Sequence, residues 1–325
     1  MSLSRLSIRS KSVARSGDFQ MRCPYAANVK GLIAVDLDGT LLDSSGKVSP
    51  RNIKAIGDLR DAGYKVVPAT GRSWRESRRI FEVINATGVA VTSGGSVLSD
   101  AVTGKTIECL AIDPALVRRL TLAVLERGLL AHLLRDHDSS CHDYCLVGTG
   151  HVNPATEWWL KAHQVDVRRV DTIEDLEKLG FDHVLRVGAV ERGDVLAPVC
   201  AAMREQFHGQ ASMQSWSAVT SNAAIGSETH LLEIYSVGTD KWTMIQKLRD
   251  RHGLSNKQVF AIGDGLNDLI MVREAGVGIA MQNAHAELRP LAKHIAPHHH
   301  DDGFAHVVEQ ILSGAICAHS VRSTM

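Results

Sequence analysis

The sequence lacks both a surplus of charge of either sign and any long hydrophobic run. Its 325 residues contain 36 Lys plus Arg and 36 Asp plus Glu, so the formal net charge is zero. A neutral chain gives no electrostatic support for a nucleic-acid or membrane-surface partner. No run approaches the roughly 18 apolar residues of a membrane-spanning helix. We therefore expect no nucleic acid and no membrane as partner. The expected assembly is a monomer or homodimer.

Cysteine is also scarce, and its spacing is irregular. The 6 cysteines are Cys23, Cys109, Cys141, Cys145, Cys200 and Cys317. A chain of this length does not depend on a disulfide framework, and the scattered positions do not indicate one. A reducing compartment is favoured, so the expected location is cytoplasmic.

The N-terminal segment differs from the rest of the chain. Residues 1–20 are rich in Ser and Arg and contain no acidic residue before Asp18. That composition is typical of an organellar transit peptide, which would direct the protein to a plastid or mitochondrion. A disordered extension, or an upstream start with Met21 as the real one, remains as an alternative. Residues 1–29 are therefore set apart from the fold as a disordered or targeting extension.

Short apolar runs alternate with stretches of helical periodicity, before residue 112 and again after residue 228. Strands are expected at 31–36, 64–70, 89–93, 231–235, 259–263 and 277–281. Helices are expected at 50–62, 73–85, 240–252 and 266–275, and near 284–292 and 303–313. Such alternation implies an α/β fold with a doubly wound parallel sheet covered on both faces.

The middle of the chain has a composition of its own and is interpreted as an inserted α/β domain. Its expected elements are helices at 114–127, 155–163 and 193–206 and strands at 129–135 and 183–189. A length of about 150 residues per domain also favours two domains. The expected division is a core of 30–111 and 229–315, an inserted domain of 112–228 and a tail of 316–325.

The strongest chemical signal is Asp36-Leu37-Asp38-Gly39-Thr40, at the end of the first expected strand. Ligands of a doubly wound sheet bind at the carboxyl ends of its strands. Two carboxylates at that point can take different catalytic roles, because one can act as a nucleophile while the other transfers a proton. Asp36 and Asp38 are therefore the candidate catalytic residues.

A second acidic group, Gly263-Asp264-Gly265-Leu266-Asn267-Asp268, also follows an apolar strand. Asp264 and Asp268 are four residues apart at a helix start, so both side chains can face one point. Carboxylate oxygens suit Mg²⁺, which keeps several waters and shares the substrate phosphate. Together with Asp36, these residues predict a Mg²⁺ site.

Two weaker signals complete the pattern. Thr70-Gly71-Arg72 ends the second expected strand, where a hydroxyl and a backbone N–H can bind a phosphoryl oxygen. Lys241 begins a helix, where its ammonium can neutralise phosphate and hold Asp36 ionised. Taken singly, an ordinary turn and a solvated lysine would explain both.

In this order, the segments resemble the haloacid dehalogenase superfamily, and within it the Cof-type phosphatases with a large type-2 cap between the second and third motifs. The resemblance covers about residues 30–315 and rests on DLDGTLLDSSGKVSP, TGR, the Lys241 segment, GDGLNDLIM and AMQNA. The chain departs from the family pattern at Trp242, where a small residue is usual, and at Ser93-Gly94-Gly95, where Asn-Gly is common.

The resemblance implies a Mg²⁺-dependent phosphatase that hydrolyses small phosphorylated metabolites through an aspartyl-phosphate. It implies that Asp36 is the nucleophile and Asp38 the general acid/base. It implies that the phosphate is bound by Thr70, Gly71, Lys241 and Asn267. It implies that the metal is held by Asp36, Asp264 and Asp268 and by the backbone carbonyl of Asp38.

Other functions stay open. A phosphomutase or phosphotransferase of the same superfamily would use the same aspartyl-phosphate. A non-catalytic metabolite-binding protein could share the fold, but the intact acidic motifs argue against it. Asp38 at the acid/base position argues against dehalogenation. The substrate is not identified, since sugar phosphates, flavin mononucleotide and pyridoxal phosphate all suit this group.

Two further polar clusters each allow two interpretations. Residues 136–145 contain Asp, His and Cys side chains that zinc could use, but no paired CxxC spacing, so a polar hairpin tip is favoured. The stretch 136–143 is our candidate for setting substrate specificity. His298-His299-His300 could bind a metal or resemble a tag, and a solvated loop is favoured.

Overall fold

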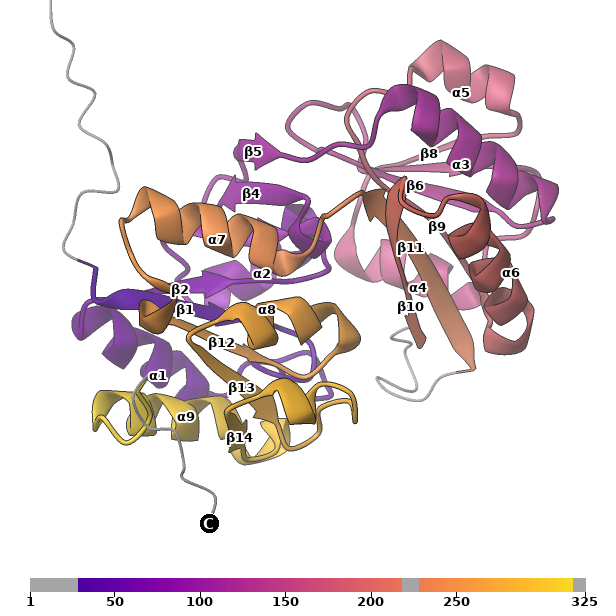
Figure 1. Ribbon diagram of the computed structural model, residues 1–325. Helices are drawn as coiled ribbons and strands as arrows, with labels where there is room; N and C mark the ends of the chain where they lie inside the picture. The colour runs from indigo at the N-terminus through magenta and orange to yellow at the C-terminus, as the bar shows by residue number, and fades with distance from the viewer. Residues whose placement is uncertain (1–28, 218–227, 318–325) are drawn as a thin grey trace, which may run out of the picture.

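The structure is a computed structural model, which describes residues 29–217 and 228–317 (Figure 1). The expected targeting segment at residues 1–20 and most of the expected tail lie outside the described residues. Figure 1 shows two lobes, one built on a parallel sheet and the other on a mainly antiparallel sheet. The first is the core, and the second is the inserted domain, which we call the cap.

The core sheet is five-stranded and parallel, in the order β14-β13-β12-β1-β2. Its strands are β1 (Gly31–Val35), β2 (Tyr64–Pro68), β12 (Val259–Gly263), β13 (Val277–Met281) and β14 (His294–Ala296). β2 lies on one side of β1, and the later strands β12, β13 and β14 follow on the other side, so β1 is the topological switch point. Such a switch point leaves a crevice at the carboxyl ends of the strands, where ligands bind.

Helices cover both faces of the core sheet, as the alternating pattern predicts. The helices are α1 (Pro50–Asp61), α2 (Trp74–Val83), α7 (Lys241–Arg251), α8 (Leu269–Glu274) and α9 (Gly303–Leu312). Along β1, Ile33 and Val35 pack against α1, α2 and α9. Leu32 and Ala34 face the opposite way and pack with residues of α7 and α8. β1 is buried on both sides because successive side chains point to opposite faces, and each face is covered.

The cap contains a six-stranded sheet in the order β10-β11-β9-β6-β7-β8. Its strands are β6 (Ala131–Arg135), β7 (Tyr144–Val147), β8 (Val167–Val170), β9 (Val184–Arg192), β10 (Ala211–Ser217) and β11 (Thr229–Ser236). Its helices are α3 (Pro114–Glu126), α4 (Pro154–His163), α5 (Ile173–Leu179) and α6 (Gly193–Gln206). Helices α3, α5 and α6 share one apolar cluster with the sheet, whereas Leu160 of α4 packs with Leu134 and Tyr144 on the other face.

The structure corrects two strand assignments. Residues 231–235, expected in the core, belong to β11, which pairs with β9 and β10 of the cap sheet. The strand expected at 89–93 is β3 (Val89–Thr92), which forms an antiparallel sheet with β4 (Val97–Asp100) and β5 (Thr106–Cys109). It meets the core sheet through the Ala69–Val91 bridge. A short apolar run fits any of these sheets, so only the pairing partners decide between them.

The helix expected near 284–292 is also wrong. Residues Arg289–Leu291 form a single 3-10 turn, and β14 follows at once. Pro290 lies in this turn, and proline lacks the N–H that a longer helix would need. The helix expected at 266–275 instead begins as a 3-10 turn, Leu266–Asp268, before α8.

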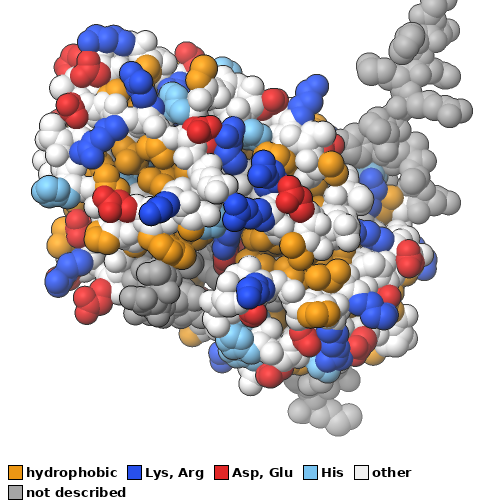
Figure 2. Space-filling view, turned by 180° about the vertical axis from the view of Figure 1, so that it is seen from behind, with side chains coloured by type: hydrophobic (Ala, Val, Ile, Leu, Met, Phe, Trp, Pro, Cys, Tyr) orange, Lys and Arg blue, Asp and Glu red, His pale blue; other side chains and the backbone are white. Residues whose placement is uncertain are grey.

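The surface agrees with the neutral composition. Figure 2 shows acidic and basic side chains interspersed over the back of the molecule. Within the described residues, no helix is both long enough and apolar enough to cross a bilayer. No disulfide joins the cysteines of these residues.

Candidate active site

Asp36 lies just beyond β1, at the crevice of the core sheet. Its N–H donates to the carbonyl of Ile262 at 3.0 Å, and the residue is only 4% exposed. The chain then turns sharply through Gly39, which has a φ of 81°. A Cβ at Gly39 would lie 2.2 Å from Asp264 Oδ2, so no other residue fits here without displacing Asp264.

The turn after β12, which carries Asp264 and Asp268, closes around the Asp268 side chain. Asp268 Oδ2 accepts the N–H groups of Asp264 and Gly265 at 3.1 and 3.0 Å. The side chain is completely buried, and Oδ1 is left to face Lys241. The turn after β12 therefore fixes both Asp264 and Asp268 beside Asp36.

Lys241, the first residue of α7, joins the two acidic segments. Its Nζ lies 2.6 Å from Asp36 Oδ1 and 2.7 Å from Asp268 Oδ1, and the side chain is fully buried. Burial disfavours the ammonium, but the Asp268 and Asp36 carboxylates outweigh it and raise the pKa of Lys241. The lysine therefore stays charged in the site.

The carboxylates outnumber this cation. One oxygen from each of Asp36, Asp264 and Asp268 lies within 4.8 Å of the others. Burial, with Asp268 and Asp38 nearby, raises the pKa of Asp36 to about 7 despite Lys241. Burial and the Asp36 and Asp268 charges also raise the pKa of Asp264. A further cation is what this excess of negative charge needs, and oxygen-only donors fit a hard divalent ion.

The predicted phosphate-binding residues surround the same point. Ala69 donates its N–H to the Val35 carbonyl at 2.8 Å, which sets Thr70 beside Asp36. Thr70 is buried, and its Oγ1 accepts the N–H of Arg72 at 3.1 Å. A methyl group at Gly71 would lie 3.6 Å from the amide nitrogen of Asn267. The structure thus brings Thr70, Gly71 and Asn267 to one side of the site.

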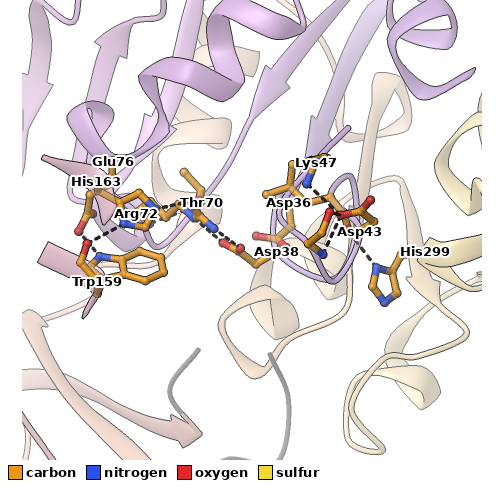
Figure 3. Close-up of polar contacts among 12 residues, drawn as sticks. Asp36, Asp38, Asp43, Lys47, Thr70, Arg72, Glu76, Trp159, His163 and His299 are labelled. Atoms are coloured by element: carbon orange, nitrogen blue, oxygen red, sulfur yellow. Dashed lines mark hydrogen bonds and ion pairs between the residues drawn. The ribbon is translucent and has the colours of Figure 1, made fainter. Parts of the chain in front are cut away.

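Asp38 takes a different environment from Asp36 (Figure 3). Its side chain is 36% exposed, and both of its oxygens accept N–H groups from Arg72. The Arg72 Nε lies 2.7 Å from Asp38 Oδ2. The two aspartates of one motif therefore differ in burial and in the cation that they contact.

Sequence reasoning missed three contacts of this site. Arg72 belongs to the TGR segment but was given no role. Thr40 Oγ1 donates to Asp264 Oδ1 at 3.1 Å. Asn283 Nδ2 donates to the Gly39 carbonyl at 2.8 Å and lies 3.3 Å from Asp264 Oδ2. All three lie within the motif segments DLDGT, TGR and AMQNA, which was the available signal.

The two further polar clusters make contacts of their own. In the stretch 136–143, Asp136 accepts from Thr106 Oγ1 at 2.6 Å, and His137 stacks on Trp74 with ring centroids 5.3 Å apart. His299 is buried rather than solvated, and its Nδ1 lies 2.8 Å from the Leu42 carbonyl. Within residues 29–217 and 228–317, three potential metal-ligand side chains come together at His298–His300 and at the Asp36 site, and not at 136–145.

Replacing Lys241 with methionine is expected to destabilise the fold by about 3–5 kcal/mol, because Asp36 and Asp268 would be buried without their cation. Urea unfolding of the metal-free protein measures the loss. Lys247→Met is the matched control, because Lys247 lies on the same helix with its side chain 37% exposed. Equal stability of the two variants would contradict this role of Lys241.

Comparisons with known proteins identify the family. A model of the haloacid dehalogenase-like hydrolases matches residues 33–308. The 5-amino-6-(5-phospho-D-ribitylamino)uracil phosphatases YcsE and YitU of Bacillus subtilis are 26% and 27% identical to this chain. These alignments cover 85% and 87% of this chain and 94% and 97% of the relatives.

Solved structures share the fold. A haloacid dehalogenase-like hydrolase from Bacteroides thetaiotaomicron has a TM-score of 0.69 at 22% identity, covering 86% of this chain and 99% of its own. A sugar phosphatase of haloacid dehalogenase subclass IIB has a TM-score of 0.68 at 18% identity, covering 88% and 100%. Since the family model spans both parts of the core and the cap between them, the chain belongs to the haloacid dehalogenase-like hydrolases.

Proposed function

We propose that this protein is a Mg²⁺-dependent phosphatase that hydrolyses small phosphorylated metabolites through an aspartyl-phosphate on Asp36. The observation that carries the proposal is the placement of the Asp36 carboxylate. It lies at the crevice of the sheet, paired with Lys241 and within 4.8 Å of the Asp264 and Asp268 oxygens. A carboxylate held by a lysine ammonium beside a second, more exposed carboxylate is equipped for nucleophilic attack with proton transfer.

The residues that would hold Mg²⁺ are Asp36, Asp264 and Asp268 through their carboxylates and Asp38 through its carbonyl. Their donor atoms are all oxygens, which Mg²⁺ prefers. When bound, the ion would offset negative charge on the carboxylates and on the phosphoryl oxygens. Thr40 and Asn283 would fix the orientation of the Asp264 carboxylate through the hydrogen bonds described above.

The protein's own residues would carry the chemistry in two halves. Asp36 attacks phosphorus while Lys241, the Thr70 hydroxyl, the Gly71 N–H and the Asn267 amide bind phosphoryl oxygens. Asp38 gives its proton to the leaving oxygen as the bond to phosphorus breaks. Asp38 then accepts a proton from the water that attacks the aspartyl-phosphate, which releases phosphate and restores Asp36.

Mg²⁺ is expected to raise the melting temperature more at pH 8 than at pH 5.5. The pKa of Asp36 is about 7 in the metal-free fold, against about 3.9 in an unfolded chain. Between these values the folded state binds more protons, so metal-free stability falls as pH rises from about 4 to 7. A cation relieves this loss at pH 8 but must displace a proton at pH 5.5.

Thermal melts in EDTA and in one fixed Mg²⁺ concentration test this at both pH values. The concentration is set at about 100 times the dissociation constant at pH 8, where the stabilisation is then about 2.7 kcal/mol. Asp264→Asn should remove most of the shift, because it deletes a ligand. Asp58→Asn, at an exposed site on α1, should keep it. A shift of the same size at both pH values would contradict a site that titrates near pH 7.

For the substrate, we propose a phosphomonoester of a sugar or sugar alcohol. Support comes from the relatives, two of which are named as phosphatases of a phosphorylated ribitylamino compound. A solved structure with the same fold is named as a sugar phosphatase. A relative from Arabidopsis thaliana is named as chloroplastic, so a plastid location is kept as a proposal beside the cytoplasm.

A phosphate-release assay tests the function. The protein is given 4-nitrophenyl phosphate and a panel of sugar and sugar-alcohol phosphates, each with Mg²⁺ and with EDTA. We expect release of phosphate in Mg²⁺ only, and none from Asp36→Asn. Binding without release would indicate a non-catalytic protein. Without free phosphate, transfer to a second sugar would indicate a phosphotransferase, and movement of the phosphate to another position of the same sugar would indicate a phosphomutase.

A further inference from the structure

Every polar group of the Arg72 guanidinium has a partner, and the partners come from both lobes. Nε and Nη2 donate to the two oxygens of Asp38 in the core. Nη1 lies 3.1 Å from Nε2 of His163, on helix α4 of the cap. The Trp159 ring, also on α4, lies 4.8 Å from Cζ (Figure 3). One arginine therefore links the candidate acid/base to the cap.

The direction of the Arg72–His163 hydrogen bond follows from the other ring nitrogen. His163 Nδ1 lies 2.9 Å from the carbonyl oxygen of Trp159, which can only accept. Nδ1 therefore carries the proton, and Nε2 is free to accept from Arg72. Burial lowers the pKa of His163, which agrees with a neutral ring.

Trp159 is itself fixed by a buried carboxylate of the core. Its Nε1 donates to Glu76 Oε1 at 2.6 Å, and the Tyr144 hydroxyl donates to the same oxygen at 3.0 Å. The other oxygen of Glu76 accepts the Ser73 N–H at 2.6 Å, within the capping box of α2. Trp159 and Tyr144 belong to the cap, whereas Glu76 belongs to the core. The Glu76 carboxylate therefore fixes the orientation of the Trp159 ring, against which Arg72 lies.

We propose that Trp159 and His163 are positioning residues, which hold Arg72 so that it orients Asp38 for proton transfer. The inference rests on the proposed function and adds to it that helix α4 of the cap controls the acid/base. Arg72 has 10% of its side chain exposed and Asp38 has 36%. Without its cap partners the guanidinium could turn toward solvent, and the Asp38 carboxylate would lose its fixed direction.

The consequence is a specific kinetic defect. As the bond between Asp36 and phosphorus forms, the proton of Asp38 moves to the leaving oxygen. A poor leaving group needs that proton more than a good one. A misplacement of about 1 Å in a catalytic group can cost on the order of 10²-fold in rate. Loss of positioning should therefore slow phenyl phosphate much more than 4-nitrophenyl phosphate.

The test compares His163→Leu, His163→Gln and Trp159→Leu with the wild type on these two substrates in Mg²⁺. We expect His163→Leu and Trp159→Leu to lower kcat for phenyl phosphate by about 10- to 100-fold. The loss for 4-nitrophenyl phosphate should be at least about fivefold smaller, and KM should change little. His163→Gln should recover most of the rate, because the glutamine oxygen can accept from Arg72 in place of Nε2.

Lys161→Leu is the matched control, because Lys161 lies on α4 with an exposed side chain. It should keep the wild-type rates on both substrates. Equal losses on both substrates in folded His163→Leu, or no recovery in His163→Gln, would overturn the positioning role. A wild type that hydrolyses neither substrate nor any sugar phosphate would overturn the proposed function, and this inference with it.

Discussion

Replacing Asp36 with asparagine is expected to abolish turnover, with a loss in kcat on the order of 10⁶-fold, the size reported when an enzyme loses its nucleophile. The amide oxygen can still accept from Lys241, so the shape of the site is kept. The amide is not a nucleophile toward phosphorus, so no aspartyl-phosphate forms. Phosphate release from the best substrate of the panel measures the loss.

The variant should not lose stability, and this separates chemistry from folding. Burial and nearby carboxylates already raise the pKa of Asp36 to about 7, so the ionised form is disfavoured in the metal-free fold. A neutral asparagine relieves that repulsion, and metal-free stability above pH 7 should be equal to or greater than that of the wild type. Asp58→Asn is the control for activity. Residual turnover above about 1% would contradict Asp36 as the nucleophile.

The core of the site was predictable because its parts follow apolar strands. Asp36 and Asp264 come directly after β1 and β12, which are neighbours in the parallel sheet. The carboxyl ends of parallel neighbours lie at one edge, so strand prediction alone brings the two aspartates together. Lys241 was harder, because a lysine at a helix start has no signal of its own. Its assignment depended on the companion motifs, and the buried contacts with Asp36 and Asp268 explain its place.

The links between core and cap were not predictable from pattern. Arg72 and His163 are 91 residues apart, and Glu76 and Trp159 are 83 apart. Neither contact leaves a periodic or spaced signature, because each depends on how two lobes meet. The same limit explains β11, whose short apolar run fits a core strand as well as a cap strand. By contrast, Ser49-Pro50 marked the start of helix α1 correctly. A helix N-cap is a local contact, here the hydrogen bond that the Asn52 N–H donates to Ser49 Oγ at 3.1 Å.

Replacing Asp38 with asparagine is expected to lower kcat by about 10²–10⁴-fold, the usual contribution of general acid/base catalysis. Asp36 is unchanged in this variant, so its attack on phosphorus remains possible. With 4-nitrophenyl phosphate the leaving group needs little help, and the aspartyl-phosphate should still form. Its hydrolysis lacks a base for the attacking water, so the intermediate should accumulate. Rapid-quench mass spectrometry should then find phosphate on the peptide that contains Asp36.

The time course gives an independent measure of the same step. A variant that accumulates the intermediate should release a burst of nitrophenol close to one equivalent per enzyme, followed by a slow steady state. Arg72→Lys is the comparison, because it leaves Asp38 in place but removes the two-pronged contact with its carboxylate. It should show a smaller loss in kcat and a smaller burst.

The stereochemistry at phosphorus decides between the covalent and direct routes. Two successive in-line displacements, first by Asp36 and then by water, return phosphorus to its starting configuration, whereas one direct attack by water inverts it. A substrate that carries a chiral thiophosphate labelled with ¹⁶O and ¹⁸O, hydrolysed in H₂¹⁷O, should therefore give thiophosphate with retention in the wild type. Inversion, together with no burst in Asp38→Asn, would mean that water attacks the substrate directly. Asp36 would then be only a metal ligand, and the contact between Lys241 and Asp36 would serve the metal site rather than a nucleophile.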